Sequence, residues 1–254
     1  MESGRRIAFL AAALSLVAFG CGRTPEPAGH PVPGPSRNPA PVTMPYEPRI
    51  DPNDFVAEID NPYLPLAVGR TFVFEGASDG ERERVEITVT DRTREVMGVT
   101  TTVIRDRAFV EGAVVEDTFD WFAQDRWGNV WYFGEDTAEY EDGQVVTRAG
   151  SWEAGEDGAR PGVVMLAEPR VGDRYRQEFF DGEAEDMARV RATGGSVTVP
   201  AGSFHDVLVT EDWTPLEPDI IEHKTYAPGV GVILERVVEG GSGVLRLVEI
   251  RDAP

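Results

Sequence analysis

The feature that most constrains the fold of this chain is a series of short segments in which polar and apolar residues alternate. From Arg84 to Thr90, the side chains of Val85, Ile87 and Val89 fall on one face and polar side chains fall on the other. Alternation with a period of two is typical of a β-strand that buries one face. Residues 84–90 therefore predict such a strand.

The same pattern recurs along the chain in segments rich in Val, Ile, Thr and aromatic residues. The predicted strands are residues 99–103, 114–124, 130–133, 144–147, 175–180, 187–192, 197–199, 207–213, 222–226, 230–239 and 244–250. Turn-forming pairs such as Asp79-Gly80 and Asp142-Gly143 separate them. The pattern predicts an all-β fold, an antiparallel meander that forms either an unclosed barrel or two packed half-barrel sheets.

The N-terminal segment has the layout of a bacterial lipoprotein signal peptide. Arg5 and Arg6 precede an apolar core over residues 7–19, and Cys21, the only cysteine of the chain, follows. A membrane-spanning helix needs roughly 20 apolar residues, so this core is too short for one. We expect residues 1–20 to be cleaved and Cys21 to be lipidated. The alternative is ordinary cleavage that leaves a free thiol.

Proline recurs every few positions between residues 24 and 52, together with Gly, Ser and Ala. Such a composition favours an extended chain without a packed core, so residues 21–54 predict a disordered tether. Residues 55–254 are then a single antiparallel β domain. Within it, Gly69 to Phe72 resembles Gly172 to Tyr175, which suggests an internal duplication of residues 60–150 and 165–252.

The formal net charge is −21, and residues 1–20 carry +1, so the mature chain carries −22. This balance argues against nucleic acid or an anionic lipid surface as a partner. A well-solvated secreted surface explains the charge, and so does a role in binding cations.

Aromatic residues are densest in a predicted hairpin around Gly128-Asn129. The candidate ligand-binding residues are Trp121, Phe122, Trp131 and Phe133. Rings that meet across two strands form a core or line a groove for an apolar or sugar-like ligand. The sequence leaves both interpretations open.

Carboxylates crowd the same hairpin, and hard cations such as calcium take six to eight oxygen ligands. The candidate metal ligands are Asp120, Asp125, Glu135 and Asp136, although their spacing fits no calcium-loop motif. A solvated acidic face is the alternative interpretation, and no other cofactor is expected. A second acidic group lies at residues 181–186.

Three segments carry a resemblance to a known family. They are Asn61 to Phe72, Val199 to Phe204 and Lys224 to Val232. These turn and strand-start segments resemble those of uncharacterised bacterial envelope lipoproteins, which are similar in fold to the LolA and LolB type of lipoprotein carrier. The resemblance implies an unclosed β-barrel and supplies no catalytic or binding residues.

Taken together, these features predict an extracytoplasmic lipoprotein that is anchored to a bacterial membrane, the outer one in a cell with two membranes. It would be a non-enzymatic binding or scaffold module that holds an apolar ligand such as a lipid, or an envelope protein. The alternative is a carboxylate-dependent or metal-dependent hydrolase. That function requires two or more candidate residues to converge in a cleft, within roughly 5–9 Å. The candidates are Asp120, Glu135, Glu178, Glu222 and His223.

Overall fold

The computed structural model describes residues 45–252. The predicted signal peptide, Cys21 and most of the predicted tether lie outside the described residues. Within residues 45–252, no helix is long and apolar enough to cross a membrane. A short 3₁₀ helix, η1 (Pro52–Asp54), precedes the strands.

The strands are β1 (Phe55–Val56), β2 (Asp60–Asn61), β3 (Leu64–Pro65), β4 (Thr71–Ser78), β5 (Glu81–Val96), β6 (Val99–Val110), β7 (Ala113–Asp125), β8 (Val130–Glu141), β9 (Gln144–Thr147), β10 (Trp152–Glu153), β11 (Arg160–Met165), β12 (Arg174–Arg176), β13 (Glu178–Phe179), β14 (Met187–Thr193), β15 (Ser196–Val199), β16 (Gly202–His205), β17 (Leu208–Trp213), β18 (Ile221–Ala227), β19 (Gly231–Glu239) and β20 (Gly243–Arg251).

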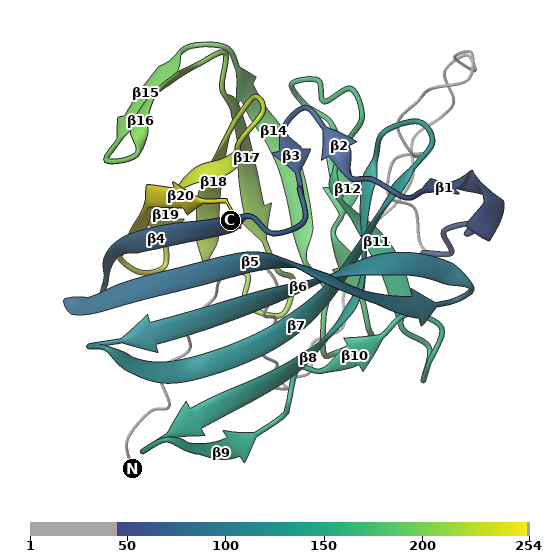
Figure 1. Ribbon diagram of the computed structural model, residues 1–254, viewed down its shortest axis with the longest axis horizontal. Helices are drawn as coiled ribbons and strands as arrows, with labels where there is room; N and C mark the ends of the chain where they lie inside the picture. The colour runs from purple at the N-terminus through teal and green to yellow at the C-terminus, as the bar shows by residue number, and fades with distance from the viewer. Residues whose placement is uncertain (1–44, 253–254) are drawn as a thin grey trace.

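The main sheet curls into a nearly closed antiparallel barrel. Its strand order is β12-β14-β17-β18-β19-β20-β4-β5-β6-β7-β8-β11-β13. Figure 1 shows β5 to β8 as a curved band, and the β15–β16 hairpin projecting beyond the sheet. The predicted all-β fold is confirmed. Of the two predicted forms, the structure adopts the unclosed barrel.

Side chains alternate along β5 as its sequence predicts. Val85, Ile87 and Val89 are buried inside the barrel. On the opposite face, Arg84 and Glu86 form an ion pair with 2.7 Å between Nη2 and Oε1. The apolar interior and the ion-paired exterior therefore follow directly from the period of two.

One end of the barrel is closed by the segment that contains β2 and β3. The side-chain amide of Asn61 donates hydrogen bonds to the carbonyl oxygens of Gly128 (2.8 Å) and Leu166 (3.0 Å). Leu64 and Leu66 of the same segment are buried in the core. The polar anchors and the apolar side chains together hold this segment in place as a plug.

The two end strands of the sheet, β12 and β13, are separated in the chain only by Gln177. The chain therefore crosses from one edge of the sheet to the other at this residue. Gly162 of β11 lies against the crossing, because a Cβ at this position would be only 2.2 Å from the carbonyl carbon of Gln177. We call residues 174–179, together with the part of β11 beside them, the seam.

Tyr46 covers the outside of the seam. Its hydroxyl donates a hydrogen bond to the carbonyl oxygen of Pro161 on β11 (2.9 Å). Its ring lies 5.9 Å from the ring of Phe179 on β13, and the guanidinium of Arg176 on β12 lies 5.6 Å from its ring centroid. One residue of the predicted tether thus contacts three strands. The packed part of the chain therefore begins before residue 55.

The echo predicted around Gly69 and Gly172 has a structural counterpart. Both glycines have positive φ angles, +88° and +96°. The amide of Gly69 donates to the carbonyl of Val89 (2.8 Å), and the amide of Gly172 donates to that of Val190 (2.9 Å). The two turns therefore join their strands in the same way. Duplication of the two halves as a whole stays a prediction.

Candidate functional site

The four aromatic side chains predicted to line a groove lie on two different faces of the sheet. Trp131 and Phe133 are on the outer face, where the ring of Phe55 lies 6.4 and 5.5 Å from theirs. Trp121 is on the same face beneath the guanidinium of Arg94, which is 4.2 Å from its ring centroid.

Phe122 points into the barrel, where it stacks on Tyr132 with 4.8 Å between centroids. All four predicted side chains are buried. The structure packs them as core and does not bring them together on one surface.

The four predicted metal ligands are also divided. Asp125 holds the β7–β8 turn, where it accepts hydrogen bonds from Asn129 and from the indole of Trp131. Asp136 is exposed and pairs with Arg148.

Asp120 and Glu135 do lie opposite each other across β7 and β8, inside the barrel. Across residues 45–252, no group of three or more His, Cys, Asp or Glu side chains is arranged to hold a metal ion.

The interior of the barrel is acidic away from the plugged end, a feature that the sequence analysis found only in part. The carboxyl groups enclosed there are Glu83, Asp106, Glu116, Asp120, Glu135, Glu178, Asp186, Asp212, Glu222 and Glu235. Four of the five predicted catalytic residues belong to this set, and three of them, Asp120, Glu135 and Glu178, influence one another. A fourth, Glu222, lies nearer the open end. His223 is on the opposite face, where its Nε2 is 3.7 Å from a carboxylate oxygen of Glu211.

Lys224, the only lysine of the chain, lies among these carboxylates and is itself buried. Its Nζ is 3.4 Å from Oδ2 of Asp212, and Glu235 is its partner in the β18–β19 register. The side-chain amide of Gln177, the residue that crosses the seam, donates to the same Oδ2 (3.3 Å). Burial alone would lower the pKa of Lys224, but Glu235 and Asp212 raise it well above its usual range.

Burial also raises the pKa of Asp106 and Glu178 well above the usual range, because water no longer solvates their charged forms. Burial raises the pKa of Asp120 to about 8, although the Tyr132 hydroxyl donates a hydrogen bond to it (2.8 Å). Burial, and then repulsion from Asp120, raises the pKa of Glu135 well above its usual range. Asp120 therefore favours its protonated form near neutral pH and loses the proton as the pH rises.

Several carboxylate oxygens in this interior accept no hydrogen bond. These are both oxygens of Glu135 and of Glu178, Oδ1 of Asp212 and Oε1 of Glu235. A buried polar group without a partner costs about 1–3 kcal/mol. Each of these oxygens therefore favours a proton or a cation beside it.

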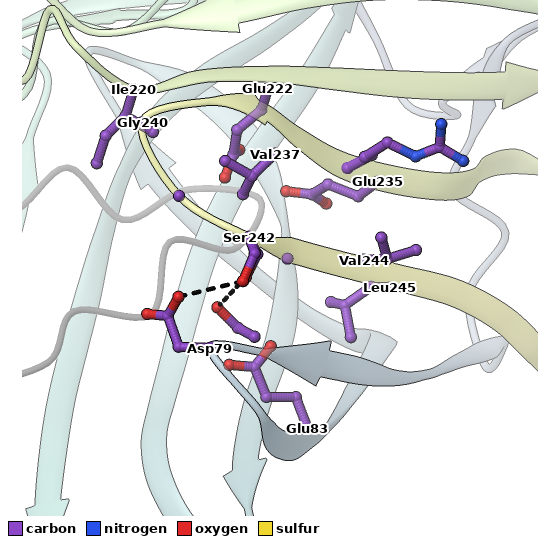
Figure 2. Close-up of a pocket in the computed structure, with 14 residues that line it drawn as sticks. Asp79, Glu83, Ile220, Glu222, Glu235, Val237, Gly240, Ser242, Val244 and Leu245 are labelled. Carbon is purple, nitrogen blue, oxygen red and sulfur yellow. Dashed lines mark hydrogen bonds between the residues drawn. The ribbon is translucent and has the colours of Figure 1, made fainter.

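The acidic interior opens at a pocket of about 120 Å³ between the β4–β5 turn, β18 and the β19–β20 hairpin. We call it the mouth pocket. Figure 2 shows the side chains of Glu222 and Glu235 together on one side of it and Glu83 on the other. At the rim, the hydroxyl of Ser242 donates to Oδ1 of Asp79 (3.2 Å).

Two glutamates of the mouth pocket form an interacting pair. Burial, and then the neighbouring Glu235 carboxylate, raises the pKa of Glu222 well above its usual range. Burial raises the pKa of Glu235 as well, while Lys224 opposes that shift. Because Glu235 also faces Lys224, it links the mouth pocket to the enclosed interior.

Four residues of this interior were not among the site residues expected from the sequence, namely Glu83, Asp212, Lys224 and Glu235. The alternation of side chains could have identified Glu83. It lies two residues before Val85 in the same strand and therefore points inward as well. For Glu235, simple alternation does not predict on which face of the sheet the side chain lies, because the pairing of β18 with β19 shifts register twice.

The fold and the site define a class of protein, a nearly closed antiparallel β-barrel with an acidic interior and an acidic mouth. No protein-family model matches the chain, and no curated protein matches it.

Two crystal structures are similar to it. One is described as a "putative exported protein with YmcC-like fold" from Bacteroides fragilis NCTC 9343, with 17% identity over 77% of this chain and 100% of that chain and a TM-score of 0.44. The other is described as a "putative lipoprotein" from Parabacteroides distasonis ATCC 8503, with 10% identity over 75% of this chain and 99% of that chain and a TM-score of 0.41.

Proposed function

We propose that this protein is a non-enzymatic binding module of the bacterial cell envelope, and that its mouth pocket binds a positively charged ligand. The observation that carries the proposal is the pair Glu222 and Glu235 at an open pocket, where Oε1 of Glu235 accepts no hydrogen bond. A buried carboxylate is stable only when a cation or hydrogen bonds replace the water it has lost. A bound cation would supply that replacement.

The interior gives less support to an apolar ligand, which the resemblance to lipoprotein carriers led us to expect. The spaces beside Leu64 and Leu66 measure about 30 and 20 Å³. A single water molecule needs roughly 10–15 Å³ by a comparable measure, so these spaces are too small for an acyl chain. The acidic mouth pocket, at about 120 Å³, is larger than either of these two spaces.

The anchoring proposal rests on the sequence. Lipidated Cys21 would tie the chain to the membrane, and Tyr46 packs on the barrel. The 24 residues between them would span up to roughly 75 Å if extended at about 3.1 Å per residue. The mass of the mature protein tests this proposal, because acylation adds mass that Cys21→Ser removes.

Calorimetric titration tests the cation-binding proposal. The chain with Cys21→Ser, which lacks the lipid, is titrated at pH 7.5 with CaCl₂, tetramethylammonium chloride, 1,5-diaminopentane and Nα-acetyl-argininamide. We expect at least one of these cations to bind, and Glu222→Gln to weaken its binding tenfold or more. Glu239→Gln is the matched control, because Glu239 is an exposed residue of β19. If none of the four cations binds, the proposal fails.

A second candidate function, a carboxylate-dependent hydrolase, is favoured by the convergence of Asp120, Glu135 and Glu178. Burial raises the pKa of Asp120 to about 8, so it would hold a proton near neutral pH, as a general acid must. The three side chains are only 1–3% exposed, so a substrate would reach them only through an opened barrel. Hydrolysis of a glycoside or ester panel that Asp120→Asn abolishes would favour this function. No turnover of the panel would exclude it for those substrates.

A further inference from the structure

The walls of the mouth pocket combine carboxylates with aliphatic side chains. Its apolar lining comes from Ile220, Val237, Val244 and Leu245, and Glu222 and Glu235 lie beside them. We infer that the ligand carries a primary alkylammonium group, –CH₂–NH₃⁺, with its carbon chain along the aliphatic wall. This inference rests on the proposed function and specifies its ligand.

The barrel already encloses one group of this kind. The butyl chain and ammonium of Lys224 lie inside, with Asp212 at 3.4 Å and Glu235 opposite in register. Glu235 therefore has Lys224 on its interior side and the mouth pocket on its other side. A ligand ammonium between Glu222 and Glu235 would lie between two carboxylates, as the ammonium of Lys224 does, but nearer the opening of the barrel.

A divalent metal ion fits the site less well. Calcium takes six to eight oxygen ligands, and magnesium requires near-ideal octahedral geometry. In the part of the chain that the structure describes, no three acidic or histidine side chains are arranged around a common metal position. An ammonium needs only two or three acceptors, and the glutamate pair supplies them.

A guanidinium group also fits less well. On the outer surface, Arg105 binds Asp117 through two parallel hydrogen bonds, from Nε (2.8 Å) and Nη2 (2.5 Å). Such a fork takes both oxygens of one carboxylate at once. In the glutamate pair, Oε1 of Glu235 is the oxygen without a hydrogen-bond partner, and a single free oxygen suits a compact point charge better than a fork.

Binding would exchange a proton for the ligand charge. Burial beside Glu235 raises the pKa of the Glu222 carboxyl well above its usual range and so favours its protonated form. An arriving R–NH₃⁺ would favour the ionised form, so the proton would pass from Glu222 to the solvent and the ammonium would take its place. The charged groups that face Glu222 are Lys224 on its own strand, Asp212 on β17, Glu235 and Arg236 on β19, and Glu83 and Asp79 at the β4–β5 turn.

The test titrates the Cys21→Ser chain with five probes in calorimetry at pH 7.5. They are 1,5-diaminopentane, Nα-acetyl-lysinamide, Nα-acetyl-argininamide, tetramethylammonium chloride and CaCl₂. We expect at least one of the two alkylammonium probes to bind at least tenfold more tightly than each of the other three. Buffers with different ionisation enthalpies should reveal the release of up to one proton per ligand.

The variants Glu222→Gln and Glu235→Gln should each abolish the alkylammonium preference, and Glu239→Gln should keep it. Circular dichroism shows whether each variant folds, and Glu222→Gln carries the test if Glu235→Gln does not fold. Binding of the lysine amide alone would indicate a lysyl side chain as the source, and binding of the diamine would indicate a free amine.

Tighter binding of calcium or of the arginine amide would overturn the inference and leave the proposed function standing. Equal binding of tetramethylammonium would also overturn it, because that ion donates no hydrogen bond. If no probe binds, the proposed function itself fails.

Discussion

Replacing Lys224 tests whether the acidic interior depends on its one lysine. In Lys224→Met the apolar stem is kept and the ammonium is lost, so Asp212 and Glu235 no longer face a positive charge. Removal of one partner from a buried ion pair costs about 3–5 kcal/mol, because the remaining charge stays buried without compensation. We therefore expect the free energy of unfolding, measured by urea denaturation at pH 8, to fall by about that amount.

The loss should depend on pH. Burial already raises the pKa of Glu235 while Lys224 is present, and the shift grows when Lys224 is removed. At pH 5 the carboxyls near residue 224 can take up a proton, so the variant should lose less stability there than at pH 8. Asp212→Asn in the Lys224→Met background should recover part of the loss at pH 8. A loss of less than about 1 kcal/mol at pH 8, typical of an exposed pair, would refute the reasoning. Equal losses at pH 5 and pH 8 would refute it as well.

Three further predictions concern pH and the seam. Burial raises the pKa of Glu116 to about 7, so the folded state binds more protons than the unfolded state above pH 4, and stability should fall as pH rises from about 4 to 7. In Glu116→Gln, the fall in the free energy of unfolding over this pH range, measured by urea denaturation, should be smaller by about 3 kcal/mol. An unchanged dependence of stability on pH would contradict the attribution of the fall to Glu116. Tyr46→Ala should lower the free energy of unfolding by about 3 kcal/mol because it removes a ring packed on the seam. Tyr46→Phe should lose only about 1 kcal/mol, and equal losses would contradict the role of the ring. Gly162→Ala should destabilise by at least about 1–3 kcal/mol in thermal unfolding, because its Cβ would lie 2.2 Å from the carbonyl carbon of Gln177. A neutral effect would show that the seam is not held closely there.

Alternation was enough to predict the fold class and several strands. Val85, Ile87 and Val89 lie inside as their period of two requires, and the hairpin around Gly128-Asn129 joins β7 to β8 as predicted. Such patterns are local, since each depends only on neighbours two positions away. Local patterns therefore predicted local structure well.

The candidate site could not be predicted in the same way. Period-two alternation does not reveal that Phe55, distant in sequence, covers Trp131 and Phe133. It also does not reveal that Lys224 and Glu235 are paired, because the register of β18 with β19 shifts on either side of them. Both features depend on which distant strands pair and on where bulges shift their register, and neither can be deduced from neighbours two positions away.

A crystal structure of the chain with 1,5-diaminopentane bound at pH 7.5 would show whether the mouth pocket binds an alkylammonium group. We expect one amine nitrogen within hydrogen-bonding distance, about 2.7–3.2 Å, of carboxylate oxygens of both Glu222 and Glu235. Lys224 should keep its contact with Asp212. An empty mouth pocket, or a diamine bound only to carboxylates on the outer surface, would contradict binding between the two glutamates.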